Sequence, residues 1–193
     1  MATVLENRRD HLTAGRRRGR AAVRVGVDAT QIVFGVSGGV EVYFRTLVRA
    51  LLLDRERVSP ALVARAEQVP RLRADFGDLP IRVLPTVYAP LPVRAARWLR
   101  RKLGPAPAVQ TPPPPSVPFR AIEQELGLDV LHSPVQLFAD LGFRAPGVLN
   151  LHDLQHVHFP ENFTPAEREM RDRLYGDSAR HAAAVVASSE FVR

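Results

Sequence analysis

Residues 148–161 read VLNLHDLQHVHFPE, a mainly apolar run that ends in three histidines and one aspartate. The run Val148–Leu151 is short and bounded by polar residues, which is typical of a buried strand. His152 and Asp153 follow at once, so side chains that can do chemistry gather where the strand is expected to end. In open α/β sheets, ligands bind outside the carboxyl ends of the strands. The segment therefore predicts both a strand of such a sheet and the place of a binding site.

Other short apolar runs alternate with helical patterns along the chain. One stretch has apolar residues at helical spacing, and Glu41 and Arg45 in it lie four apart as a favourable pair. A second stretch begins with Thr164-Pro-Ala-Glu167, a capping box with proline at the first helical position, and predicts a helix through about Arg180. This alternation predicts a parallel sheet covered on both faces. The strand runs are 23–27, 61–64, 81–84, 130–131, 148–151 and 183–187, and the first helical stripe is Val40, Phe44, Leu47, Val48, Leu51 and Leu52.

Composition places the chain among ordinary globular proteins. It has 193 residues, of which 46% are hydrophobic and 24% charged, enough for one domain with a real core. The absence of cysteine excludes disulfides and thiolate metal sites. Every apolar run is far shorter than the roughly 18 residues of a membrane span. We expect a soluble, cytoplasmic protein.

The net charge of +7 is concentrated at the amino terminus. Residues 1–24 hold seven arginines against Glu6 and Asp10, a surplus of five. We expect residues 1–22 to form a flexible basic arm, without the apolar core of a signal peptide. Such an arm is either a solvated tail or a peripheral contact with the acidic inner face of a membrane, where each basic residue contributes about 1 kcal/mol.

Two further segments depart from the strand-helix pattern. Residues 104–118 contain seven prolines and predict a stiff loop. This loop is a ligand for a proline-recognition domain, another functional loop or a disordered one, and these alternatives stay open. At the end of the chain, Ser188-Ser-Glu190 predicts a helix start just before Arg193. One turn of helix does not hold by itself, so we expect the intact protein to continue.

Gly38 and Gly39 precede the first predicted helix. Backbone N–H groups there can face an anion without obstruction by Cβ atoms. The spacing of Gly35, Gly38 and Gly39 matches neither the Walker sequence nor the Rossmann fingerprint. The alternative is a bare turn between strand and helix.

The histidine cluster allows three interpretations. His152 and His156 lie one helical turn apart, which with Asp153 suits zinc or iron, although no His-Glu-x-x-His motif is present. Phe159-Pro160 also disfavours a long helix through these residues. The second interpretation is a polar site for a sugar or phosphate, with His152 as a hydrogen-bonding or acid–base group. The third is a loop whose imidazoles satisfy neighbouring backbone groups.

Four segments together resemble one family, the amino-terminal half of retaining family 4 glycosyltransferases. They are GGVEVY at 38–43, DVLHS at 129–133, HDLQH at 152–156 and SSEF at 188–191. Their order and spacing agree over residues 23–193, and the most specific part runs from HDLQH through Phe159-Pro-Glu161 to the end. Glu161 and Glu169 have the spacing of the family's acidic pair, but they lie in the wrong half of the protein and the match is accidental.

The resemblance implies a GT-B architecture of two Rossmann-like domains facing across a cleft. Residues 23–193 would form the acceptor-side half, a three-layer α/β domain with a mainly parallel sheet, and the carboxyl-terminal donor-binding domain would be missing. The intact enzyme would be a hexosyltransferase that moves a sugar, with retention, from a nucleotide-diphosphate-sugar to a glycan or lipid acceptor in polysaccharide or lipid biosynthesis. No metal, other cofactor or nucleic-acid partner is expected. The fragment alone should be inactive.

The resemblance also implies roles for single residues. His152 would be the catalytic residue, in contact with the transferred sugar or the acceptor, while Gly38 and Gly39 approach the donor diphosphate. Retention by front-face attack needs no protein nucleophile. Two rivals remain: a module without catalytic activity whose basic arm binds an anion, nucleic acid or lipid, and a metal-dependent hydrolase. The substrate-binding set implied by the resemblance is Gly38, Gly39, Tyr43, Asp153 and His156.

Overall fold

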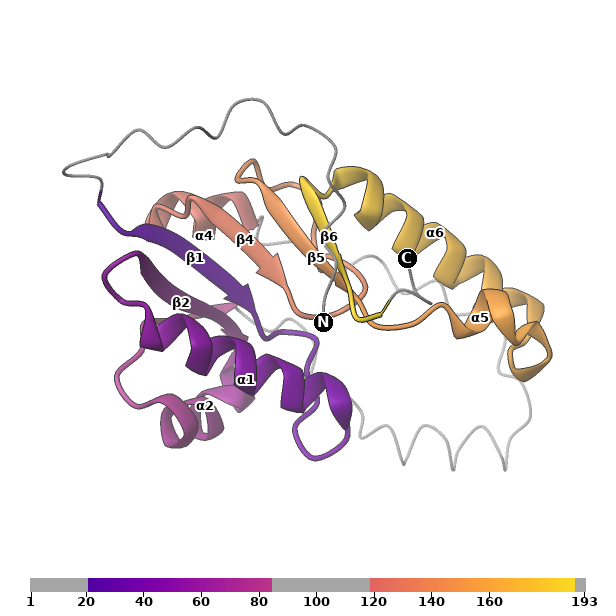
Figure 1. The fold of residues 1–193 in the computed structure, drawn as a ribbon, viewed down its shortest axis with the longest axis horizontal. Coiled ribbons are helices and arrows are strands. Elements are labelled where there is room, and N and C mark those ends of the chain that lie inside the picture. Colours follow the sequence, from indigo (N-terminus) through magenta and orange to yellow (C-terminus); the bar gives the residue numbers. More distant parts are fainter. Residues whose placement is uncertain (1–20, 85–118, 190–193) are drawn as a thin grey trace.

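The computed structural model describes residues 21–84 and 119–189 (Figure 1). The prediction of a stiff loop over 104–118 lies outside the described residues, as do residues 1–20 of the predicted basic arm and the last two residues of the SSEF segment, Glu190 and Phe191.

The centre of the fold is a six-stranded sheet in which every neighbouring pair is parallel. The predicted parallel sheet is therefore confirmed, and each strand overlaps its predicted run. The order is β3-β2-β1-β4-β5-β6, so the chain first builds outward from β1 and then returns to its other side. The order reverses between β1 and β4, which makes their carboxyl ends the topological switch point. The strands are β1 Val23–Asp28, β2 Val58–Arg65, β3 Ile81–Leu84, β4 Val130–Ser133, β5 Gly147–Leu151 and β6 Ala184–Ala187.

Helices pack on both faces of this sheet, as predicted. Leu62 and Val63 are neighbours on β2, and because side chains alternate along a strand they enter different cores. Leu62 packs with Phe44 and Val48 of α1 and with α2, whereas Val63 packs with Ile122 of α4. The result is a three-layer, Rossmann-like α/β arrangement. Its helices are α1 Gly39–Leu53, α2 Val69–Phe76, α4 Phe119–Leu126, α5 Gln155–His158 and α6 Pro165–His181, with short 3-10 turns at Ala66–Gln68 and Pro160–Asn162.

The ends of the helices follow the local sequence. α6 begins at the predicted capping box, where the Thr164 N–H donates to the Glu167 carboxylate at 2.9 Å and the Glu167 N–H donates to Thr164 Oγ1 at 3.2 Å. α5 is a single turn that ends before Phe159-Pro160, so the expectation that no long helix runs through the histidines is confirmed. In Figure 1, α5 lies beside α6 at one end of the molecule.

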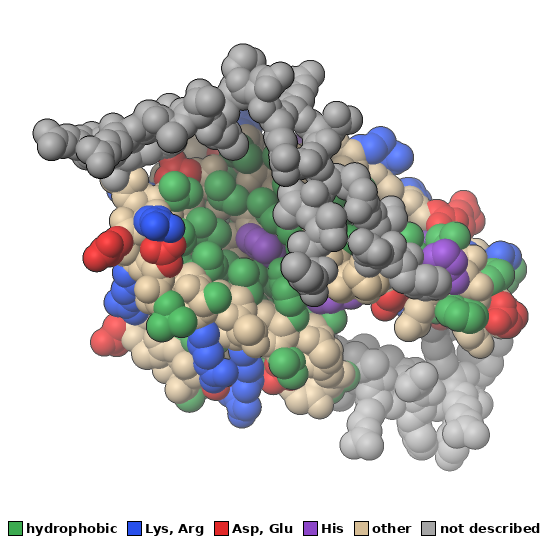
Figure 2. Space-filling view, viewed as in Figure 1, with side chains coloured by type: hydrophobic (Ala, Val, Ile, Leu, Met, Phe, Trp, Pro, Cys, Tyr) green, Lys and Arg blue, Asp and Glu red, His purple; other side chains and the backbone are tan. Residues whose placement is uncertain are grey.

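On the face shown in Figure 2, hydrophobic and charged side chains occupy different regions. Figure 2 shows hydrophobic side chains gathered over the strands in this view and charged side chains mainly around the margin. Among the described residues, no helix is both long and apolar enough to cross a bilayer.

Candidate functional site

A pocket of about 220 Å³ lies at the carboxyl ends of the central strands. Gln31 reaches it from the loop after β1, Gln136 from the loop after β4, and His152 from the loop after β5. Val40 places the first turn of α1 against the same pocket. This is the switch point of the sheet, the place where open α/β folds bind ligands. We call it the switch-point pocket, and its lining residues are Gln31, Val40, Val135, Gln136, Leu137, His152, Asp153 and Tyr175.

His152 uses both ring nitrogens within the chain. Its Nε2 lies 2.7 Å from the Pro134 carbonyl oxygen, which only accepts, so Nε2 carries the proton and donates it. The Asn150 side-chain nitrogen lies 3.1 Å from Nδ1 and 3.0 Å from Nε2, and with Nε2 engaged it donates to Nδ1. His152 therefore joins β5 to the loop after β4 and fixes the wall of the pocket.

Tyr43 connects α1 to the same histidine. Its ring lies edge-on to the His152 ring, with 5.3 Å between the ring centroids. The Tyr43 hydroxyl lies 3.5 Å from Nε2 of His132, at the end of β4. Burial raises the pKa of Tyr43 and lowers the pKa of His132 to about 4, so both are uncharged at neutral pH. The predicted residues Tyr43 and His152 are thus brought together.

Two residues at strand ends escaped assignment from the sequence. His132 lies in register with Val27 of β1 and Val148 of β5. Asp28 ends β1, is 1% exposed, and accepts hydrogen bonds at Oδ1 from the Thr30 N–H at 2.8 Å and the Thr30 hydroxyl at 2.6 Å. Desolvation raises the pKa of Asp28 to about 6, although the Thr30 hydrogen bonds and the charge of Arg65 oppose this shift. The sequence signal that could have identified both residues is a polar residue at the end of an apolar strand run.

The glycines lie beside the pocket in open space. Gly38 precedes α1 with φ +52, a left-handed conformation that favours glycine. A Cβ at Gly38 or Gly39 would meet no atom within 4 Å, so the backbone there is accessible. The loop before α1 is held by a hydrogen bond from the Gly35 N–H to the Glu41 carboxylate at 2.6 Å. The predicted pair of Glu41 with Arg45 forms at 2.9 Å, and Arg45 also reaches Asp75 of α2 at 2.9 Å.

Asp153 and His156 take different positions. Asp153 lines the switch-point pocket, and its backbone N–H donates to Gln136 Oε1 at 2.8 Å. His156 is buried behind Tyr175, with 5.2 Å between the ring centroids, and its Nε2 lies 3.2 Å from Asp172 Oδ1 on α6. His156 lines instead a second, shallower depression between α5 and α6. The His156 ring contacts Tyr175, which lines the switch-point pocket. In the described parts of the chain, no three His, Asp or Glu side chains gather to hold a metal ion.

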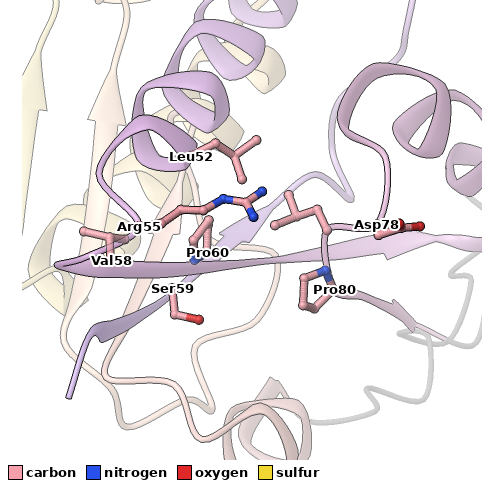
Figure 3. A pocket seen from close by; sticks show the side chains of 8 residues that line it. Leu52, Arg55, Val58, Ser59, Pro60, Asp78 and Pro80 are labelled. Atoms are coloured by element: carbon pink, nitrogen blue, oxygen red, sulfur yellow. The ribbon is translucent and has the colours of Figure 1, made fainter.

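A larger pocket of about 450 Å³ lies at the opposite end of the sheet (Figure 3). It is formed beside the amino end of β2 by Leu52, Arg55, Asp78 and their neighbours. None of the site residues predicted from the sequence lines this pocket. Because the strand ends and the polar cluster meet elsewhere, the smaller switch-point pocket is the better candidate site.

No family model matches the sequence, and the searches among curated proteins and solved structures found no match.

Proposed function

We propose that this chain is the acceptor-side domain of a retaining glycosyltransferase, which moves a sugar from a nucleotide diphosphate to an acceptor hydroxyl. The observation that carries the proposal is the switch-point pocket, which His152 and Asp153 line and the first turn of α1 borders. The resemblance of GGVEVY and HDLQH to the family supports it, since both segments meet at this pocket.

The position of the glycines suits the phosphate part of the donor. Helix amino ends favour anions, because N–H groups point outward there and the helix dipole is positive. Gly38 and Gly39 leave that end of α1 open. A diphosphate bound there would place its sugar toward the pocket that begins at Val40. Charge that develops on the departing phosphate would be stabilised in part by these N–H groups and in part by a donor-binding domain.

The role proposed for His152 is contact with the sugar from a fixed ring. Because both ring nitrogens already bind protein groups, His152 acts by position more than by proton transfer. Its bond to Pro134 holds the loop that carries Gln136. In front-face attack the leaving phosphate helps to deprotonate the acceptor hydroxyl, so the mechanism requires no protein nucleophile. Loss of the ring would let the pocket wall move, and small misplacements of this kind cost on the order of 100-fold in rate.

The test is a transfer assay on the complete product of the coding sequence that contains residues 1–193. It would be incubated with radiolabelled uridine- and guanosine-diphosphate sugars and with lipid and glycan acceptors. We expect label in the acceptor with the anomeric configuration of the donor, and a loss on the order of 100-fold in kcat/KM for His152→Ala. Asp78→Asn, at the opposite end of the sheet, is the matched control and should keep full activity. The proposal would be refuted if the protein neither transfers sugar from any nucleotide sugar nor binds one.

A further inference from the structure

We infer that the switch-point pocket selects an uncharged sugar ring and disfavours rings that carry a carboxylate or phosphate. This inference rests on the proposed function and narrows its substrate class. It follows from which polar groups of the pocket are already used by the protein and which remain open to a ligand.

Gln136 and Gln31 each use one end of the side-chain amide within the protein and leave the other end free. Gln136 uses its side-chain oxygen to accept the Asp153 N–H at 2.8 Å, so its NH₂ group remains as a donor. Gln31 uses its side-chain nitrogen to donate to the Leu137 carbonyl at 3.2 Å, so its oxygen remains as an acceptor. Within the described residues, neither free end has a partner. The pocket therefore offers a neutral donor and a neutral acceptor, each held in place by a bond at the other end of its amide.

Tyr175 and Asp153 continue this pattern. The Tyr175 hydroxyl accepts from Arg171 at 3.1 Å, which leaves its proton to donate. One oxygen of Asp153 accepts the Gln155 N–H at 3.3 Å, and the other is open. The pocket thus offers both hydrogen-bond donors and hydrogen-bond acceptors. Sugar hydroxyls both donate and accept, so a polyol can satisfy every one of these groups, whereas a group that only accepts cannot.

The charges of the described residues around the pocket disfavour an anionic ring. None of its lining residues is Lys or Arg, and Asp153 is a carboxylate. His132 and Tyr43, which lie behind His152, are uncharged at neutral pH. Arg171 donates to the Tyr175 hydroxyl and lies over the Phe163 ring, and it is not one of the lining residues. Among the described lining residues, a ligand carboxylate or phosphate would meet Asp153 without a compensating cation.

The size of the pocket sets the length of the ligand. Its volume of about 220 Å³ is below the roughly 300–1,000 Å³ of pockets that hold drug-sized molecules. Val40, Val135 and Leu137 supply an apolar wall for the C–H face of a ring. The space fits one ring and not an oligosaccharide.

The experiment compares matched ligands on the full chain by saturation-transfer NMR at constant ionic strength. The probes are methyl α-glucoside and methyl α-mannoside, which are neutral, and methyl glucuronide and glucose 6-phosphate, which are anionic. We expect the neutral probes to bind with dissociation constants of about 1 mM, and the anionic probes to bind at least about tenfold more weakly. UDP-glucose is titrated in parallel to test the proposed function separately.

Asp153→Asn is the variant that tests the charge. Asn keeps the oxygen that accepts the Gln155 N–H, so the start of α5 is preserved. We expect the preference for neutral over anionic probes to fall at least about threefold. Asp78→Asn should leave the preference unchanged. If Asp153→Asn does not fold, as judged by circular dichroism, the ratio measured on the unaltered chain decides the question.

Anionic probes that bind as tightly as the neutral ones would overturn the inference and leave the proposed function standing. Binding of UDP-glucose without binding of either neutral glycoside would also overturn the inference and would leave the proposed function standing. If neither UDP-glucose nor any of the four probes binds, the inference is overturned, and the proposed function is decided by the transfer assay with the full set of nucleotide sugars.

Discussion

Asp28→Asn should stabilise the protein at neutral pH and not in acid. Asp28 is the last residue of β1 and is 1% exposed. Desolvation raises the pKa of its carboxyl group from 3.8 to about 6. In the unfolded chain the same group ionises at its ordinary pKa. Between these two values the unfolded state therefore loses its proton first, and stability falls as the pH rises. A shift of roughly two units corresponds to about 3 kcal/mol, lost in full above the folded pKa.

Asn removes that loss and keeps the local hydrogen bonds. The Thr30 N–H and hydroxyl both donate to Oδ1, and the Asn side chain retains an oxygen at that position. We expect the free energy of unfolding of Asp28→Asn to exceed that of the unaltered chain by about 3 kcal/mol at pH 7, and to equal it near pH 3.8.

The assay is urea unfolding followed by circular dichroism at a series of pH values. The difference between the two proteins at each pH cancels the other titrating groups. Asp78→Asn, a substitution of the same type at the amino end of the sheet, should change stability by no more than about 0.5 kcal/mol at any pH. A difference for Asp28→Asn that does not vary with pH would refute the assignment of the raised pKa to this carboxyl.

Three further outcomes are expected. His132 has a pKa lowered by burial from 6.5 to about 4, so stability falls as the pH drops through this range, and His132→Asn should reduce that loss in the same urea series. The Ala side chain of Gly38→Ala would meet no neighbouring atom but would have to keep φ +52, so this variant should lose roughly 1 kcal/mol of stability in thermal unfolding. Gly39 has no positive φ, so Gly39→Ala should lose less. Equal losses for the two variants would contradict backbone strain at Gly38. Deleting residues 1–22 should abolish sedimentation with anionic vesicles at low salt and leave glycoside binding intact; vesicle binding that persists would exclude the arm as the membrane contact.

Much of the fold follows from local patterns. The six strands could be predicted because each is a short apolar run with its own boundaries, and periodicity is a property of neighbouring residues. The start of α6 could be predicted because a capping box is complete within four residues, Thr164 to Glu167. The pair of Glu41 with Arg45 is likewise set by the spacing of one helix.

The candidate site is only partly local. His152, Asp153 and Tyr43 were singled out from the sequence, and the structure brings them to adjoining positions at the switch point. The family resemblance implied that His156 would lie beside them in the substrate pocket. The orientation of a helix as short as α5 depends on the element that packs against it. Here that element is α6, which places Asp172 and Tyr175 against the His156 ring. His156 is therefore not among the residues that line the switch-point pocket, although Tyr175, which it contacts, is.

The sequence by itself determined the elements of this protein: parallel strands, two capped or striped helices, and polar groups at the ends of strand runs. Only the tertiary structure decided the strand order, the burial of Asp28 and His132, and the set of groups that faces one pocket. The physical reason is the separation along the chain over which each interaction acts. Helical periodicity and capping act over a few residues, whereas the pairing of β1 with both β2 and β4, and the desolvation that shifts a pKa, arise between segments far apart in the chain.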